Sequence, residues 1–241
     1  MQTLGVILAR AGSIGLQNKH LLPLLGRPVI SYTFDHARAA RRLDRVVVSS
    51  DCPRILDLAR RNGFDTVRRP AHLATSDASV QDTMIHAMRA VEADESFQSD
   101  ALVVLYGNVP VRPVGVIDHA IELLEQSDCD SVRSFCPVGK WHPAWMSKLD
   151  GDHVTALRPG SIHRRQDLEP LHLHDGGVVA VSRKSMLLGE EHPEDPHAFF
   201  GSDRRAIQTA MGETVEIDQQ RDFYWAEAVL RAQSQSMRLA S

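Results

Sequence analysis

A short apolar run near the start of the chain leads directly into a turn that carries glycines and cations. The run covers residues 4–9, and the turn continues through Arg10, Gly12, Ser13, Gly15 and Lys19. Glycines let backbone N–H groups approach phosphate oxygens, and successive N–H groups form an anion-binding concavity. Arg10 adds a planar fork of donors, and Lys19 adds a point charge. The turn matches neither common glycine-rich nucleotide motif, so phosphate binding and an ordinary strand-to-loop turn are both open interpretations.

Two carboxylates stand close together near the other end of the chain. Glu216 and Asp218 fall in the segment 213–218, which has the composition of a strand. Alternate residues of a strand point to the same face, so these two side chains would project together. Like charges on one face repel unless a cation lies between them, and a hard divalent metal takes oxygen ligands while keeping waters for substrate phosphates. A metal site is one interpretation, and a solvated acidic edge strand is the other.

An irregular segment, 139–175, breaks the regular pattern of the chain. A segment of that length without periodicity is usually a functional insertion. Inside it, Arg164, Arg165 and Gln166 combine two planar cations with an amide. Such a set suits a carboxylate with hydroxyl neighbours, and the alternative is a solvated run of charges.

The elements that must position these residues alternate between strands and helices. Strands are expected at 4–9, 45–50, 65–68, 101–106, 131–136, 177–182 and 213–218. Helices are expected at 28–41, 53–62, 79–94, 114–126 and 221–236. This alternation predicts a doubly wound, mostly parallel sheet of the Rossmann-like α/β class, with helices on both faces. In such a sheet, ligands bind at the carboxyl ends of the strands, where Arg10, Asp51, Tyr106 and Asn108 follow their strands.

Length and composition restrict the class of protein further. A chain of 241 residues, with 43% apolar and 24% charged residues, can form one well-buried globular α/β domain. A net charge of -4 gives no basic field for nucleic acid, and no apolar run approaches the ~20 residues of a membrane span. We see no signal peptide at the start. Three cysteines without a C-x-x-C pair fit a reduced, cytoplasmic protein.

Seven blocks of sequence, all in the same order as in a known family, carry a resemblance that covers almost the whole chain. They are residues 9–20, 26–33, 46–51, 69–79, 142–146, 164–170 and 216–223. The first corresponds to the family's A-R-x-G-S-K-G…K-N loop, and the last corresponds to its D-I-D-x-x-x-D-F motif. The chain thus resembles the CMP-sialic acid synthetases, or acylneuraminate cytidylyltransferases, and their relatives that activate other nonulosonic acids and Kdo.

The resemblance implies a Mg²⁺-dependent nucleotidyl transfer on a fold of the nucleotide-diphospho-sugar transferase type. The hydroxyl of a sugar acid would attack the α-phosphorus of CTP and expel pyrophosphate. Catalytic roles are implied for Arg10, Lys19 and Asp218, and metal binding for Asp218 with Glu216. Nucleotide contacts are implied for Ala9, Arg10, Gly12, Ser13, Gly15, Lys19, Arg69, Ala78, Ser79 and Asn108. Sugar-acid contacts are implied for Tyr106, Arg164, Arg165 and Gln166.

The resemblance also implies partners. The chain would act as one cytidylyltransferase domain over 1–241, with 139–175 as a protruding substrate and dimerisation insertion. Trp141 and Trp145 suit the homodimer contact that this insertion would make. The expected small-molecule partners are CTP and a sugar acid, without nucleic acid or membrane.

The departures from the family pattern leave alternatives open. The family's loop lysine is Ile14 in this chain, and an aspartate is replaced by Glu216. The segment 105–112 reads Leu-Tyr-Gly-Asn-Val-Pro-Val-Arg, which is closer to the L-Y-G-D-V-P of hexosamine-1-phosphate uridylyltransferases. Asn108 then stands where that aspartate helps to hold magnesium. The alternatives are a nucleotidyltransferase for another sugar or base, and a catalytically weakened, nucleotide-binding homologue.

Overall fold

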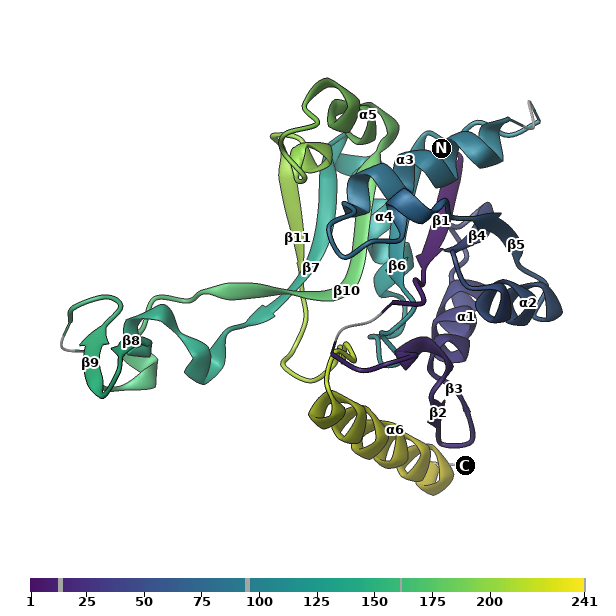
Figure 1. The fold of residues 1–241 in the computed structure, drawn as a ribbon. Coiled ribbons are helices and arrows are strands. Elements are labelled where there is room, and N and C mark those ends of the chain that lie inside the picture. Colours follow the sequence, from purple (N-terminus) through teal and green to yellow (C-terminus); the bar gives the residue numbers. More distant parts are fainter. Residues whose placement is uncertain (13–14, 94–95, 161, 241) are drawn as a thin grey trace.

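A seven-stranded sheet forms the body of the computed structural model, which describes residues 1–12, 15–93, 96–160 and 162–240. The strand order is β11-β7-β10-β6-β1-β4-β5 (Figure 1). The strands are β1 (Thr3–Leu8), β4 (Arg45–Ser50), β5 (Asp65–Arg68), β6 (Ala101–Tyr106), β7 (Ser131–Pro137), β10 (His172–Ser182) and β11 (Arg204–Gln208). Only β10 runs antiparallel to its neighbours, so the predicted mostly parallel α/β class is confirmed.

Helices cover both faces of this sheet. The helices α1 (Val29–Ala39), α2 (Pro53–Arg61) and α4 (Val116–Ser127) bury their apolar sides against one face. On the other face lie α3 (Val80–Glu92) and α5 (Arg183–Glu191). The last helix, α6 (Gln220–Ala240), packs on the small pair β2 (Pro23–Leu24) and β3 (Arg27–Pro28) below the sheet (Figure 1). None of the described helices is long and apolar enough to cross a membrane.

Local sequence signals set several of the helix ends. Pro53 occupies the first turn of α2, where its missing N–H costs no hydrogen bond. Gly63 follows that helix with φ +78°, a conformation that glycine adopts without strain. The Oγ of Ser79 accepts a hydrogen bond from the backbone N–H of Asp82 at 2.9 Å and so caps α3. Glycine after α2 and serine before α3 are thus local signals that agree with the observed helix ends.

The predicted strand at 213–218 is wrong. This segment is irregular and makes one isolated bridge, between Val111 and Val215. The backbone N–H of Ile217 donates to the carbonyl of Asn108 at 2.8 Å, so the segment bonds to the loop after β6 and not to a neighbouring strand. One edge of the sheet is formed by β11, whose sequence is mostly charged and polar and buries only Ile207.

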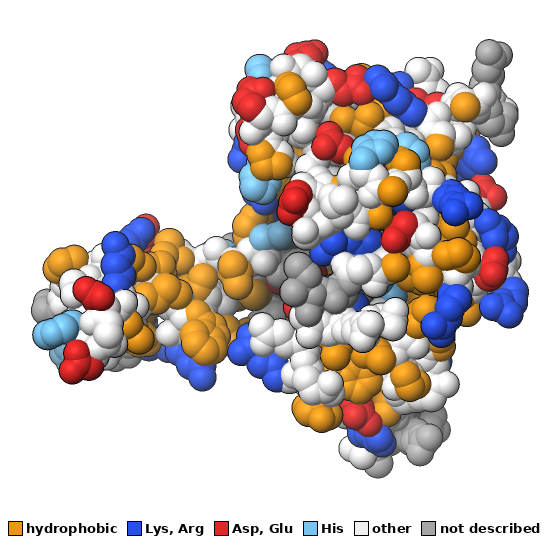
Figure 2. Space-filling model, viewed as in Figure 1, with side chains coloured by type: hydrophobic (Ala, Val, Ile, Leu, Met, Phe, Trp, Pro, Cys, Tyr) orange, Lys and Arg blue, Asp and Glu red, His pale blue; other side chains and the backbone are white. Residues whose placement is uncertain are grey.

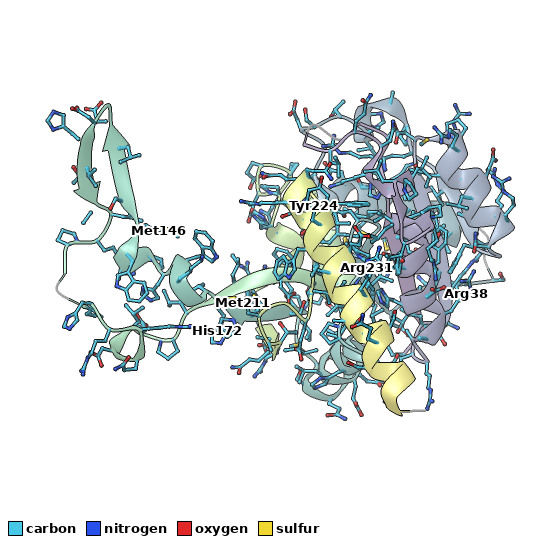
Figure 3. All side chains as sticks on the ribbon, turned by 90° about the horizontal axis from the view of Figure 1, so that it is seen from below. Arg38, Met146, His172, Met211, Tyr224 and Arg231 are labelled. Atoms are coloured by element: carbon cyan, nitrogen blue, oxygen red, sulfur yellow. The ribbon has the colours of Figure 1, made fainter. Side chains whose placement is uncertain are left out.

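An arm projects from the body between β7 and β10 (Figure 1). It carries the short hairpin of β8 (Ser147–Asp150) and β9 (His153–Ala156), and it contains the irregular segment 139–175. Figure 3 shows Met146 far out on the arm, with Met211 and His172 nearer the body. Hydrophobic side chains gather along the arm (Figure 2), among them Trp141, Leu149 and Val154, which are 61%, 73% and 68% exposed.

Candidate active site

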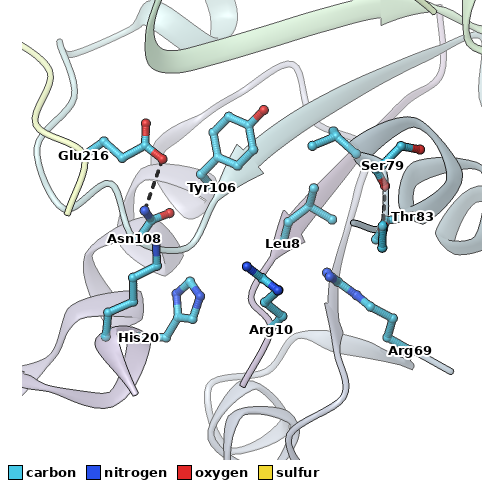
Figure 4. Close-up of a pocket in the computed structure, with 12 residues that line it drawn as sticks. Leu8, Arg10, His20, Arg69, Ser79, Thr83, Tyr106, Asn108 and Glu216 are labelled. Carbon is cyan, nitrogen blue, oxygen red and sulfur yellow. Dashed lines mark hydrogen bonds between the residues drawn. The ribbon is translucent and has the colours of Figure 1, made fainter. Parts of the chain in front are cut away.

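A pocket opens at the carboxyl ends of β1 and β6, next to the N-terminus of α3 (Figure 4). Its lining includes the predicted residues Arg10, Lys19, Arg69, Ala78, Ser79, Tyr106, Asn108 and Glu216. These residues come from six separate stretches of the chain, and the fold brings them to one place because parallel strands end at the same edge. A pocket therefore lies at the edge of the sheet where the sequence predicts that a ligand binds.

The loop after β1 is held from two sides. The backbone N–H of Ala11 donates to Oδ1 of Asp51 at 2.8 Å, which ties the loop to the end of β4. Gly15 lies so close to the segment at its back that a Cβ there would collide with the carbonyl oxygen of Asp218. Glycine is therefore required at position 15 for packing against the carboxylate segment. Ser13, predicted to contact the nucleotide, and Ile14 lie outside the described residues.

The cation of the loop and the predicted metal ligand form an ion pair. The Nζ of Lys19 lies 2.6 Å from Oδ1 of Asp218. The Lys19 side chain is 13% exposed, whereas the Asp218 side chain is 60% exposed. A ligand can therefore reach the Asp218 carboxylate from solvent, whereas the Lys19 ammonium group is largely buried. The sequence did not predict this ion pair.

Asn108 holds the two carboxylates together. Its Nδ2 donates to Oε1 of Glu216 at 3.1 Å, to the carbonyl of Ile217 at 3.0 Å and to Oδ1 of Asp218 at 3.3 Å. An aspartate at position 108 would place a third negative charge here, so the amide is the side chain that lets the pair approach. Glu216 and Asp218 share one side of the segment, as predicted, although the segment is not a strand.

The electrostatics of this corner fit a hard cation. Burial raises the pKa of Glu216, and the neighbouring charge of Asp218 raises it further. Burial, with the charge of Glu216, also raises the pKa of Tyr106 to about 12, so its phenol stays protonated. Two carboxylates supply oxygen donors of the kind that Mg²⁺ prefers. Among the residues with described positions, no group of three His, Cys, Asp or Glu side chains could hold a metal ion.

The buried side chains of Arg69 and His20 form the floor of the pocket. Nη2 of Arg69 donates to the carbonyl of Ser49 at 3.1 Å, and burial lowers the pKa of this guanidinium to about 10. Burial and the charge of Lys19 lower the pKa of His20 to about 3, so the imidazole is neutral at physiological pH. Within the described part of the chain, Nδ1 of His20 has no hydrogen-bond partner. Figure 4 shows Arg10, Arg69 and His20 together on one side of the pocket.

Some predicted residues lie away from this pocket in the single chain. Arg164, Arg165 and Gln166 belong to the arm, and Arg164 is paired with Asp167 at 2.7 Å. Ala9 is buried, with its N–H donating to the carbonyl of Ser49 at 3.1 Å. Neither Ala9 nor Gly12 lines the pocket. Their predicted contacts with ligands stay predictions.

Other lining residues were not predicted from the sequence. Leu8, His20, Val80 and Thr83 complete the wall. His20 directly follows Lys19, and Val80 directly follows Ser79. Their position next to a predicted site residue is the only feature of the sequence that could have identified them. Oγ1 of Thr83 donates to the carbonyl of Ser79 at 3.0 Å (Figure 4), which is visible only once α3 is formed.

Comparisons with known proteins agree on one family. The family model described as cytidylyltransferase matches residues 4–235. The chain is 30% identical over 227 residues to an N-acylneuraminate cytidylyltransferase of Streptococcus agalactiae serotype V, over 92% of this chain and 52% of that protein. It is 25% identical to a CMP-N,N'-diacetyllegionaminic acid synthase of Legionella pneumophila, over 98% of this chain and 100% of that protein. The chain thus spans about half the length of the first of these relatives.

A solved structure gives the fold independently of sequence. The structure of CMP:2-keto-3-deoxy-manno-octonic acid synthetase complexed with CTP superposes with a TM-score of 0.72. The match covers 97% of this chain and 100% of that one at 17% identity, so it supports the fold alone. Together with the site geometry and the match over residues 4–235, these comparisons show that the chain belongs to the cytidylyltransferase family.

Proposed function

We propose that this chain transfers the cytidylyl group of CTP to a hydroxyl of a nonulosonic, sialic-type sugar acid. The observation that carries the proposal is the meeting of the Arg10 and Lys19 cations with the Glu216 carboxylate in one pocket. The Asp218 carboxylate does not line that pocket but contacts two residues that do, Lys19 and Asn108. This is the charge pattern that a triphosphate and its metal require. The names of the relatives supply the base and the class of acceptor.

The reaction needs positioning and charge more than covalent help from the protein. The acceptor oxygen forms a bond to the α-phosphorus, and the bond from that phosphorus to the bridging oxygen of the β-phosphate breaks. Pyrophosphate leaves, and the proton of the hydroxyl passes to solvent. Arg10 and Lys19 would stabilise the negative charge on the phosphates. This electrostatic stabilisation is strongest where water is excluded from the site.

Glu216 and Asp218 would hold Mg²⁺. When bound, the metal would neutralise phosphate charge and favour departure of pyrophosphate. Lys19 would then exchange the Asp218 carboxylate for a phosphate oxygen, because both compete for the same ammonium group. Arg69, Ala78 and Ser79 would contact the nucleoside, since they lie on the side of the pocket formed by α3 and the end of β5.

The arm would act in a homodimer. Its exposed apolar residues are best covered by a second copy of the chain, and Arg164, Arg165 and Gln166 would then reach the sugar acid of a pocket in that assembly. We also infer that residues 1–241 act as one domain with 139–175 as its insertion. The three free cysteines support work in the reducing cytoplasm.

A matrix of four nucleoside triphosphates against a panel of sugar acids, read as pyrophosphate release with Mg²⁺, tests the function. We expect release only with CTP and a nonulosonic acid, and loss of release in Asp218→Asn. Release with another pair would favour the alternative nucleotidyltransferase. If CTP binds by calorimetry but no pair releases pyrophosphate, the catalytically weakened homologue is the correct interpretation.

A further inference from the structure

Arg133 lies on the sheet face covered by α3 and α5, and it has no counter-ion among the described residues. Arg133 lies in β7 opposite Val179 of β10, which in turn lies opposite Val104 of β6. Both valines belong to the core beneath α3 and α5. Residues opposite one another, and residues two apart, share a face of a sheet, so Arg133 and Tyr106 lie on the same face. Tyr106 also lines the pocket, whereas Arg133 lies on the same face two strands away, in β7.

Two aromatic rings fix the direction of the Arg133 side chain. Its Cζ lies 4.1 Å from the ring centre of Phe200 and 5.0 Å from that of Phe135. A guanidinium held against ring faces keeps its planar edge of donors free for a ligand. Its Nε is buried and has no hydrogen-bond partner among the described residues. The side chain as a whole is half-buried, so a ligand can still reach it.

The charges around Arg133 do not balance it. Burial lowers its pKa, and the neighbouring charge of Arg204 lowers it further. The other titratable neighbours are Tyr106, which stays protonated, and His174, whose pKa is lowered by burial. The carboxylate next to His174, Asp175, already accepts hydrogen bonds from two hydroxyl groups and a backbone amide. In the described part of the chain Arg133 therefore forms no salt bridge, which is costly for a half-buried cation.

We propose that Arg133 recognises an oxygen-bearing, preferentially anionic substituent of the sugar acid, at the end remote from the reacting hydroxyl. This rests on the proposed function, because it names the acceptor side of the same site. The reacting hydroxyl must lie near Arg10 and Lys19, whereas Arg133 lies on the far side of Tyr106. The hydroxyl of Tyr106 points away from Arg10 and His20 (Figure 4), which leaves it on the acceptor side. Arg133 is thus a specificity-determining residue for the acceptor.

Kinetics of Arg133→Met and Arg133→Lys separate this role from a structural one. Methionine keeps the contact with both rings but removes every donor. We expect Arg133→Met to raise the KM of the acceptor about 10- to 100-fold, as for one lost charged hydrogen bond. The KM of CTP should not change, and Arg133→Lys should recover part of the loss. Arg204→Met is the matched control, because Arg204 lies 5.8 Å from the same ring but donates to Gly201 and is exposed.

A panel of acceptors with and without an anionic or carbonyl substituent at the remote end completes the test. The penalty of Arg133→Met should be present for acceptors that carry the group and absent for those that lack it. Equal KM values in wild type and Arg133→Met for every acceptor would overturn the proposal while leaving the proposed function standing. If the wild type transfers nothing, the proposed function fails. Calorimetric binding of the same sugar acids to both variants then decides the role of Arg133 alone, with equal affinities refuting it.

Discussion

At the scale of single residues, the site consists of two carboxylates, Glu216 and Asp218, and the polar groups that contact them. Asn108 donates to both carboxylates, and Lys19 pairs with Asp218. Without a ligand, these contacts restrain the negative charges at the place where the nucleotide and metal would bind. Each contact can be exchanged on binding, because a phosphate can take Lys19 and a cation can take Asp218.

Asp218→Asn should lower kcat about 100-fold, the usual effect of removing one group that stabilises charge in a transition state. The substitution keeps the shape of the side chain, so the fold and the melting temperature should change little. Pyrophosphate release at saturating CTP, acceptor and magnesium measures it. Asp57→Asn, an exposed surface pair with Arg60, is the control. Activity of Asp218→Asn equal to that of the control would remove Asp218 from the reaction.

Glu216→Gln should stabilise the metal-free protein at neutral pH. The pKa of Glu216 is raised in the folded state above its ordinary value of 4.5, so folding favours the protonated form. Protonated Glu216 makes its full contribution to the stability of the protein when the pH is below the pKa of Glu216 in the unfolded chain. That contribution is lost as the pH rises through the pKa of Glu216 in the folded protein. Glutamine stays neutral throughout. Thermal unfolding with a chelator should therefore show a higher Tm for Glu216→Gln at pH 7–8, by about 2–4 °C for each kcal/mol recovered.

The difference in Tm between Glu216→Gln and the wild type should disappear near pH 4, where both side chains are neutral. Glu194→Gln, which changes an exposed carboxylate, is the control and should leave the Tm at pH 7–8 close to that of the wild type. A lower Tm for Glu216→Gln at pH 7 would mean that the ionised carboxylate stabilises this corner, against the account given above.

Part of the site could be predicted residue by residue. Arg10 and Asn108 were proposed because each follows a predicted strand, a position that can be identified from local sequence. Ser79 was proposed as a nucleotide contact only through the family resemblance. The Lys19–Asp218 pair joins residues 199 positions apart, so only the folded chain reveals it. Arg133 was missed for a related reason. Its strand was predicted, but no pattern indicates that the guanidinium lies against the ring of Phe200, 67 positions away. Nor does a pattern indicate that no described carboxylate pairs with it.

At the scale of elements, the root of the arm is connected to the carboxylate segment. Asp175 lies where β10 bends away from the sheet, between His174 and Val179, and its pairing with β7 shifts register there. Oγ1 of Thr209 donates to Asp175 at 2.6 Å, which ties the bend to the chain that leads to Glu216. A Cβ at Gly176, whose φ is +77°, would lie 2.9 Å from Oε2 of Glu216. The bend of β10 therefore helps to place a proposed metal ligand.

Asp175→Asn should destabilise the protein by about 1.5–3 kcal/mol at pH 7, the value of a hydrogen bond to a charged group. Hydrogen bonds from Ser134, Thr209 and the Gly177 amide lower the pKa of Asp175 and outweigh its burial. Its stabilising effect is therefore present above the unfolded pKa and is lost as the pH falls through the folded pKa. Denaturant unfolding across pH 3–7 should show a difference from wild type that shrinks toward acid. A difference that is constant with pH would exclude the charged hydrogen bonds as its cause.

The elements were predicted unevenly, and the reason is physical. The buried parallel strands β1, β4 and β6 were found because both of their faces are covered and they read as continuous apolar runs. The edge strand β11 has only one buried residue, so its sequence carries little signal. The segment 213–218 has the composition of a strand, but its N–H groups bond to the loop after β6, and composition cannot show the partner.

At the scale of the whole molecule, the arm is the part that a single copy leaves uncovered. Trp141, Leu149 and Val154 expose most of their surface on a segment that lies away from the body (Figures 1 and 2). Patches of this kind usually mark an interface. We expect sedimentation to show a dimer at micromolar protein, and Trp141→Glu to shift it toward monomer because the charge would be buried at the contact.

Tyr224→Glu provides the comparison, since Tyr224 is 62% exposed on α6, away from the arm (Figure 3). It should leave the dimer intact. A monomeric wild type would refute the dimer, and dissociation by Tyr224→Glu with Trp141→Glu unaffected would move the contact to α6.

The central claim is the transfer of a cytidylyl group to a sugar acid, and ³¹P NMR of the reaction tests it most directly. With CTP, Mg²⁺ and a nonulosonic acid, the α-phosphorus resonance of CTP should be replaced by that of a phosphodiester, with an equal amount of pyrophosphate. UTP, ATP and GTP should give neither signal. Conversion of CTP to free CMP without a phosphodiester, or unchanged CTP with every sugar acid, would contradict the account.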